Sequence, residues 1–147
     1  MEILIDNQQN RFQINLSKIQ EEARVLLNAL GCPDGELSIL IVDDSQIIKL
    51  NKEYLNRDKA TNVIAFPMRE GEFTDISPNL LGDVVISADT AEREALIGGI
   101  TMEERFTQLM VHGILHLLGY DHEREGSDAN KMEEKASELL QLLDGGK

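Results

Sequence analysis

The amino-acid sequence predicts a single α+β domain, residues 1–147, in which a small mixed β-sheet packs against helices. Its length predicts one core, because 147 residues are typical of one ordinary domain. Its pattern predicts the class, because short β-branched apolar runs are interspersed with longer segments of helical spacing. Apolar residues make up 41 % of the chain and aromatic residues 4 %, so we expect a core of mainly Leu, Ile and Val.

Strands are predicted where short apolar runs are bounded by turn residues. The predicted strands are residues 3–5, 12–14, 36–42, 61–66 and 81–87. The compact apolar run at 36–42 favours a buried strand, and Pro67 stops the strand that follows. Residues 70–78 are polar and contain Gly71 and Pro78, so we expect a surface loop there.

The first predicted helix begins at Ser17, with Gln20 as the partner of a capping box, and ends at Gly31. The second has Asp44 or Ser45 as its N-cap. Its apolar face is expected to carry Ile47, Leu50 and Tyr54.

The third predicted helix covers residues 88–96 and ends at a pair of glycines, 98 and 99. Thr101 and Glu104 form a capping box that opens the fourth. The fourth is strongly apolar, and we expect it to be the central buried helix; its apolar positions are Phe106, Leu109, Met110, Ile114 and Leu117. Ser127 is predicted to cap a last amphipathic helix.

All three histidines lie in one short window, as His112, His116 and His122. The first two are one helical turn apart on the predicted central helix, so their imidazoles project from the same face. Gly119 lets the chain turn out of the helix, and His122 then folds back as a third ligand. Three protein ligands around an open position are typical of catalytic zinc, so we predict one Zn²⁺ per chain on these histidines.

The spacing of the histidines is that of the extended metalloprotease motif, but one residue differs. That motif places a glutamate, the general base, directly after the first histidine, where this chain has Gly113. Peptide hydrolysis by that route is therefore disfavoured, whereas metal-assisted attack on a phosphodiester is not. Asp121 has three candidate roles: an acceptor for an imidazole N–H, a catalytic base for the metal-bound water, or a turn residue.

Charge and cysteine content exclude several classes of protein. The net charge of −13 argues against non-specific binding to duplex DNA. Cys32 is the only cysteine, which excludes an intramolecular disulfide and a thiolate zinc cluster. The sequence shows neither a signal peptide nor an apolar stretch long enough to span a membrane, so we expect a soluble cytoplasmic protein that binds no membrane.

A local run of basic residues is a candidate for contact with a phosphate backbone. Its members are Lys49, Lys52, Arg57, Lys59 and Arg69. The alternative is a solvated helix face and loop, which composition alone favours.

The chain resembles the YbeY family of bacterial metal-dependent endoribonucleases. The family signature H-G-x-L-H-L-x-G-Y-D-H matches residues 112–122 without a gap. Similar stretches occur at residues 50–54, 61–67 and 81–83. The chain differs at Leu55, where the family usually has an arginine; Arg57 or Lys59 is then the candidate to bind the substrate phosphate. Milder differences are Ala60 for proline and Ala65 for serine.

The resemblance implies an α+β domain with zinc on His112, His116 and His122, and a cleft for single-stranded RNA. It also implies action at the 3′ end of small-subunit ribosomal RNA and in ribosome quality control. The expected partners are single-stranded ribosomal RNA and the ribosome or its proteins, whose basic surfaces suit an acidic chain. Two alternatives are a ribosome assembly or interaction factor with a mainly structural zinc, and a metallohydrolase that acts on another substrate.

Overall fold

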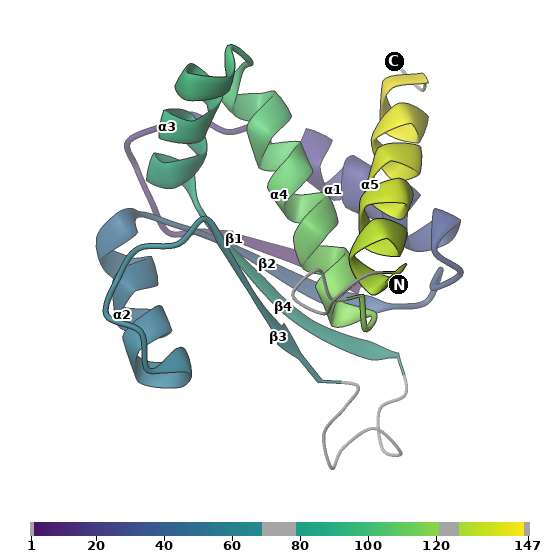
Figure 1. The fold of residues 1–147 in the computed structure, drawn as a ribbon, viewed down its shortest axis with the longest axis horizontal. Coiled ribbons are helices and arrows are strands. Elements are labelled where there is room, and N and C mark those ends of the chain that lie inside the picture. The colour runs from purple at the N-terminus through teal and green to yellow at the C-terminus, as the bar shows by residue number, and fades with distance from the viewer. Residues whose placement is uncertain (1, 69–78, 121–126, 146–147) are drawn as a thin grey trace.

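Four strands form one mixed sheet in the order β1-β2-β4-β3 (Figure 1). The computed structural model describes residues 2–68, 79–120 and 127–145. The first three strands in this order are parallel, and β3 is antiparallel to β4. The strands are β1 (Glu2–Asn7), β2 (Glu36–Val42), β3 (Val63–Pro67) and β4 (Leu80–Ser87). The predicted α+β class with a small mixed sheet is confirmed.

The helices cover the two faces of the sheet unequally. They are α1 (Leu16–Ala29), α2 (Asp44–Leu55), α3 (Ala88–Gly98), α4 (Met102–Leu117) and α5 (Ser127–Gly145). In Figure 1, α4 lies between α3 and α5, with α1 close by. These four helices and one face of the sheet share the main hydrophobic core, to which α4 contributes most residues. Among the described helices, α2 alone packs against the other face.

Alternation along β4 shows how the two faces are filled. Val84 and Ile86 point into the main core, whereas Val85 joins a smaller cluster with Ile47 of α2. Both faces of β4 are covered around Val84, Val85 and Ile86, which explains the apolar run at this point of the strand. The expected central buried helix is α4, since it contacts the sheet, α3 and α5.

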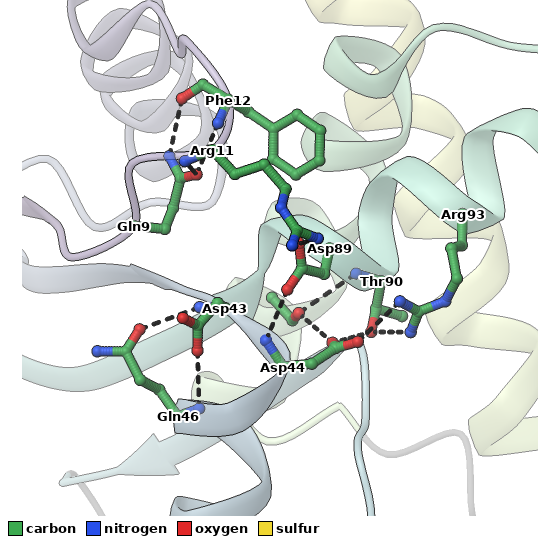
Figure 2. Close-up of polar contacts among 10 residues, drawn as sticks. Gln9, Arg11, Phe12, Asp43, Asp44, Gln46, Asp89, Thr90 and Arg93 are labelled. Atoms are coloured by element: carbon green, nitrogen blue, oxygen red, sulfur yellow. Dashed lines mark hydrogen bonds and ion pairs between the residues drawn. The ribbon is translucent and has the colours of Figure 1, made fainter.

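The strand predicted at residues 12–14 is wrong. Phe12 is half-buried against the core but belongs to an irregular segment between β1 and α1. Figure 2 shows the reason: the Gln9 side chain accepts the backbone N–H groups of Arg11 at 3.0 Å and Phe12 at 2.9 Å. It also donates to the Phe12 carbonyl at 2.9 Å. These local bonds satisfy backbone groups that a strand ladder needs.

Two predicted helix starts are also wrong, by one or two residues. The N-cap of α1 is Asn15, whose side chain accepts the N–H of Lys18 at 3.1 Å, and not Ser17. The N-cap of α2 is Asp43, which forms a capping box with Gln46. This position leaves the Asp44 side chain free for other bonds.

Tyr54 does not belong to the buried face of α2. It is 61 % exposed, whereas Asn51 on the same helix is 2 % exposed. Ile47 is fully buried, as predicted. The predicted end of α3 at Gly98 and Gly99 is confirmed, with Gly98 as its last residue and Gly99 as its C-cap. The Thr101–Glu104 capping box of α4 is also confirmed. The predicted loop at 70–78 lies outside the described residues, as does the side chain of Ser127.

None of the described helices is both long enough and apolar enough to cross a membrane.

Candidate metal centre

Helix α4 is fixed at both ends by local bonds. At its start Thr101 Oγ1 accepts the N–H of Glu104 at 3.0 Å, and Glu104 Oε1 accepts the N–H of Thr101 at 3.1 Å. At its end the N–H of Gly119 bonds to the carbonyl of His116, and that of Tyr120 bonds to Leu115, both at 3.0 Å. With Gly119 at φ 97°, these two bonds form the Schellman turn that ends a helix. The turn predicted at Gly119 is confirmed.

His112 and His116 are one turn apart on α4, and both are half-buried. The helical spacing that places both imidazoles on one face is therefore present. Partial burial suits a ligand, because it holds the ring in place while leaving one side open to solvent.

The third predicted ligand, His122, and the candidate base, Asp121, lie outside the described residues. Among the residues that are described, no three His, Cys, Asp or Glu side chains gather closely enough to hold a metal ion. Two half-buried imidazoles followed directly by a turn still fit a zinc site, because they supply two nitrogen donors on a rigid element. The full ligand set stays a prediction.

Gly113 marks the point where α4 approaches the sheet. A Cβ atom at this position would lie 2.6 Å from Val84 Cγ1 and 3.3 Å from Val63 Cγ2. No larger side chain fits without moving the helix, and one placed here would point into the sheet. The position that carries the general base in metalloproteases therefore serves packing in this chain.

Glu133 on α5 lies near the first histidine, with its Oε1 4.0 Å from His112 Nε2. Its side chain is 69 % exposed, so it faces the same solvent-accessible side as the imidazole. Sequence reasoning missed this residue, because 21 positions separate it from His112 and no spacing rule connects the two helices. A carboxylate here can orient an imidazole or attract a cation.

Arg57 and Lys59 are exposed on the loop that follows α2. Asn56 ends the helix in the left-handed conformation, with φ 56°. The buried side chain of Asn51 donates to the Lys59 carbonyl at 3.0 Å, and the Asn51 carbonyl accepts the N–H of Arg57 at 3.1 Å. These two hydrogen bonds hold the backbone of the basic loop, whereas the side chains of Arg57 and Lys59 are exposed and can reach a ligand.

The sheet face beside α2 carries a groove of about 560 Å³. Tyr54 and Phe66 line it, with ring centroids 5.5 Å apart in an edge-to-face arrangement. Leu4 of β1, which is 57 % exposed, lies on the same groove. Tyr54 of α2 is exposed and Phe66 of β3 is half-buried. Aromatic rings that line a groove are suited to stacking against bases of single-stranded nucleic acid.

A polar network joins α2 to α3 at the carboxyl ends of β2 and β4 (Figure 2). Asp44 accepts hydrogen bonds from Ser87 Oγ, Thr90 Oγ1 and Arg93 Nη1, each at 2.7 Å. Burial raises the pKa of Asp44, but the bonds from these three residues outweigh it, so the pKa lies below its usual value. The network fixes α2, and with it the basic loop, against α3 and β4.

A family model described as Endoribonuclease YbeY matches residues 4–144 of this chain. A protein of that name from Geobacter sulfurreducens is 48 % identical over 147 residues, which cover 99 % of this chain and 98 % of the relative. The one from Aquifex aeolicus is 47 % identical over 131 residues and covers 89 % and 85 %. The solution structure of TM1509 from Thermotoga maritima superposes with a TM-score of 0.71 at 25 % identity, over 98 % of this chain and 90 % of that one.

Proposed function

The chain belongs to the YbeY endoribonuclease family, and from that premise we propose that it is a metal-dependent endoribonuclease that cleaves single-stranded RNA. The observation that carries the proposal is the pair of half-buried histidines one turn apart on α4, within the matched residues 4–144. Gly113 supports phosphodiester over peptide chemistry, because its position offers no general base of the protease kind.

The metal in this proposal is one zinc ion per chain, held by His112, His116 and His122. Bound zinc lowers the pKa of a coordinated water and neutralises charge on a phosphoryl oxygen. The chain itself supplies the orientation: the Schellman turn at Gly119 redirects the backbone directly after His116. Asp121 keeps its three candidate roles, and Glu133 is a second carboxylate beside His112.

The RNA strand in this proposal is held by cations and aromatic rings from other elements. Arg57 and Lys59 bind the phosphate backbone, which compensates for Leu55 at the position where the family usually has arginine. Tyr54 and Phe66 offer ring surfaces to unstacked bases. Single strands fit better than duplex DNA, because bases must be exposed to reach the rings.

The biological role we propose is maturation of ribosomal RNA at the 3′ end of the small-subunit molecule, and ribosome quality control, in the cytoplasm. The net charge of −13 supports docking on basic ribosomal proteins and disfavours non-specific binding to nucleic acid.

The test is cleavage of a single-stranded RNA fragment from the ribosomal 3′ end by wild type and by His116→Ala, with metal content measured on both. We expect the wild type to cut and the variant to lose both metal and cleavage. Glu134→Ala, an exposed change on α5, is the matched control and should cut like wild type. Full-rate cleavage by metal-free His116→Ala would show that cleavage does not depend on a metal at this site, and would contradict the proposal.

A second function is favoured by Leu55, which is 45 % exposed where a phosphate-binding arginine is usual in the family. In this alternative the chain is a ribosome assembly or interaction factor, and its zinc stabilises the fold. Co-sedimentation with ribosomes, together with no metal-dependent cleavage in the test above, is the result that selects it. Cleavage of peptides or small molecules by the same preparation would instead select a metallohydrolase of another class.

A further inference from the structure

One row of side chains crosses all four strands on the sheet face that α2 partly covers. Each member is paired with the next in the register of the sheet: Leu4 with Ser38, Ser38 with Asp83, and Asp83 with Phe66. All four residues line the groove of about 560 Å³. At the end of the row, the rings of Phe66 and Tyr54 meet edge-to-face. The groove therefore brings together an aromatic pair, a carboxylate and a hydroxyl from four strands and one helix.

Asp83 is the charged member of this row on a central strand, β4. Its side chain is exposed and makes no hydrogen bond or ion pair with any of the described residues. Directly opposite residues on one face of an antiparallel pair have Cβ atoms about 4.5–5.5 Å apart, so Asp83 lies beside Phe66. The carboxylate is therefore within reach of a flat ligand that stacks on the aromatic pair, and it is not engaged in holding the described part of the fold together.

The hydrogen-bonding capacity of a carboxylate distinguishes between the RNA bases, because an ionised carboxylate accepts hydrogen bonds and donates none. Guanine alone presents two adjacent N–H donors, N1–H and N2–H, which can bond to both oxygens of one carboxylate. Adenine and cytosine place a ring acceptor beside their amino group, and uracil flanks its N3–H with two carbonyl oxygens. Single-stranded RNA is commonly recognised by stacking a base on an aromatic ring and bonding its Watson–Crick edge.

We propose that this groove binds a guanine base of single-stranded RNA, stacked on the Tyr54–Phe66 pair, with Asp83 accepting hydrogen bonds from N1–H and N2–H. The inference deepens the proposed function and rests on it, because it takes single-stranded RNA as the ligand. The charges beside the groove favour RNA over a basic peptide. Arg57 and Lys59 are exposed on the loop that follows the helix of Tyr54, where they attract phosphate and repel a cationic partner.

The experiment measures binding of three oligouridines by fluorescence anisotropy, each with one central guanosine, inosine or adenosine. The parent protein is the full chain with His116→Ala, so that cleavage does not interfere. We expect guanosine to bind about five- to tenfold more tightly than adenosine, the low end for a bidentate contact to a base. Inosine lacks the amino group on C2 and should fall between the two.

Asp83→Asn in the parent should bring the ratio of guanosine to adenosine affinity to about one, because an amide sets a donor against one of the guanine donors. Removing a negative charge strengthens binding of any RNA, so the readout is the ratio of affinities and not the affinity itself. Glu53→Gln is the matched control. It removes the same charge from an exposed position next to Tyr54 that does not line the groove, and should leave the ratio unchanged.

The outcomes distinguish this inference from the proposed function. Equal binding of the guanosine and adenosine oligonucleotides by the parent would overturn the inference and leave the nuclease proposal intact, and this comparison needs no Asp83 variant to fold. An unchanged ratio in Asp83→Asn would also overturn it. So would displacement of the guanosine oligonucleotide by Nα-acetyl-arginine methylamide at a lower concentration than by guanosine monophosphate, which would indicate a peptide partner. Failure of all three oligonucleotides to bind would contradict the proposed function as well.

Discussion

At the scale of one residue, Gly113 sets how closely the histidine-bearing helix α4 approaches the sheet. The helix that carries both histidines touches β4 at this position, and the closest atom to an added Cβ belongs to Val84. Val84 is fully buried and β-branched, so it cannot rotate away freely. The distance between α4 and the sheet therefore depends on the absence of a side chain.

Replacing Gly113 by alanine should therefore destabilise the fold by about 1–3 kcal/mol, the usual cost of overpacking a core. The free energy of unfolding from urea titration measures it. Gly98→Ala is the control, since a Cβ there meets nothing within 4 Å and should be neutral or slightly stabilising. A Gly113→Ala chain as stable as wild type would show that α4 is free to move off the sheet.

Glu133 is expected to support the metal through His112. Removing its charge with Glu133→Gln should weaken zinc binding about tenfold, at the low end for loss of a carboxylate beside a ligating imidazole. Competition with a zinc chelator measures the affinity. Glu134→Gln changes the next residue and should leave the zinc affinity unchanged. Equal zinc affinity of wild type and both variants would show that Glu133 does not contribute to metal binding.

The contribution of Asp44 to the free energy of unfolding should depend on pH. Its pKa in the folded chain lies below the usual 3.8, so its contribution to stability is fully present above that value. The contribution is lost as the pH falls through the lower, folded pKa. Asp44→Asn should therefore cost about 1–3 kcal/mol at pH 7, where charged hydrogen bonds are lost, and progressively less below pH 3.8.

Urea unfolding of wild type and Asp44→Asn from pH 7 to pH 3 tests this. Asp58→Asn removes an exposed charge whose nearest ion-pair nitrogen, Lys52 Nζ, is 4.0 Å away, and should have little effect at any pH. A difference between wild type and Asp44→Asn that stays constant with pH would contradict the assignment.

At the scale of elements, the loop after α2 has an anchored backbone and exposed cations. Arg57→Ala combined with Lys59→Ala should weaken RNA binding and lower the salt dependence, because each lost phosphate contact reduces the slope of log K by about 0.7. Binding is measured in the His116→Ala background, so that cleavage does not interfere. Lys135→Ala on α5 is the control and should bind RNA like the parent. An unchanged slope of log K against log salt concentration in the double variant would show that RNA does not bind at this loop.

Elements could be predicted where neighbouring residues in the sequence determine them. The Thr101–Glu104 capping box, the turn at Gly119 and the apolar run of β2 are local, and all three are confirmed. The strand predicted at residues 12–14 is wrong, because alternating burial of Phe12 and Ile14 also occurs in an irregular segment held by Gln9.

Contacts between distant elements could not be predicted from the sequence. The sequence predicts Asp44 or Ser45 as a helix cap, yet the partners of Asp44 come from α3 and the end of β4. The approach of Glu133 to His112 and the burial of Glu22 beside Thr107 depend on how α1, α4 and α5 pack. No periodicity within one helix encodes those distances, whereas the spacing of His112 and His116 needs only one helix.

At the scale of the whole molecule, the sheet lies between the two groups of residues to which the proposed function assigns metal and RNA binding. One face supports α4 and its histidines, and the other carries α2, the basic loop and the aromatic groove. In Figure 1, α2 and α4 lie apart, and both pack against β4. In the proposed function, a bound RNA strand therefore has to pass the β3 edge of the sheet to reach both the aromatic groove and the histidines. The net charge of −13 disfavours RNA elsewhere on the molecule.

In the proposed function, one zinc ion on the histidines makes this chain a nuclease. The most direct measurement is stepwise return of Zn²⁺ to chelator-treated protein, with the rate of cleavage of single-stranded ribosomal RNA recorded at each step. We expect no cleavage without metal and a rate that rises linearly to a break at one ion per chain. Full-rate cleavage by the metal-free protein, or a rate indifferent to added zinc, would contradict it.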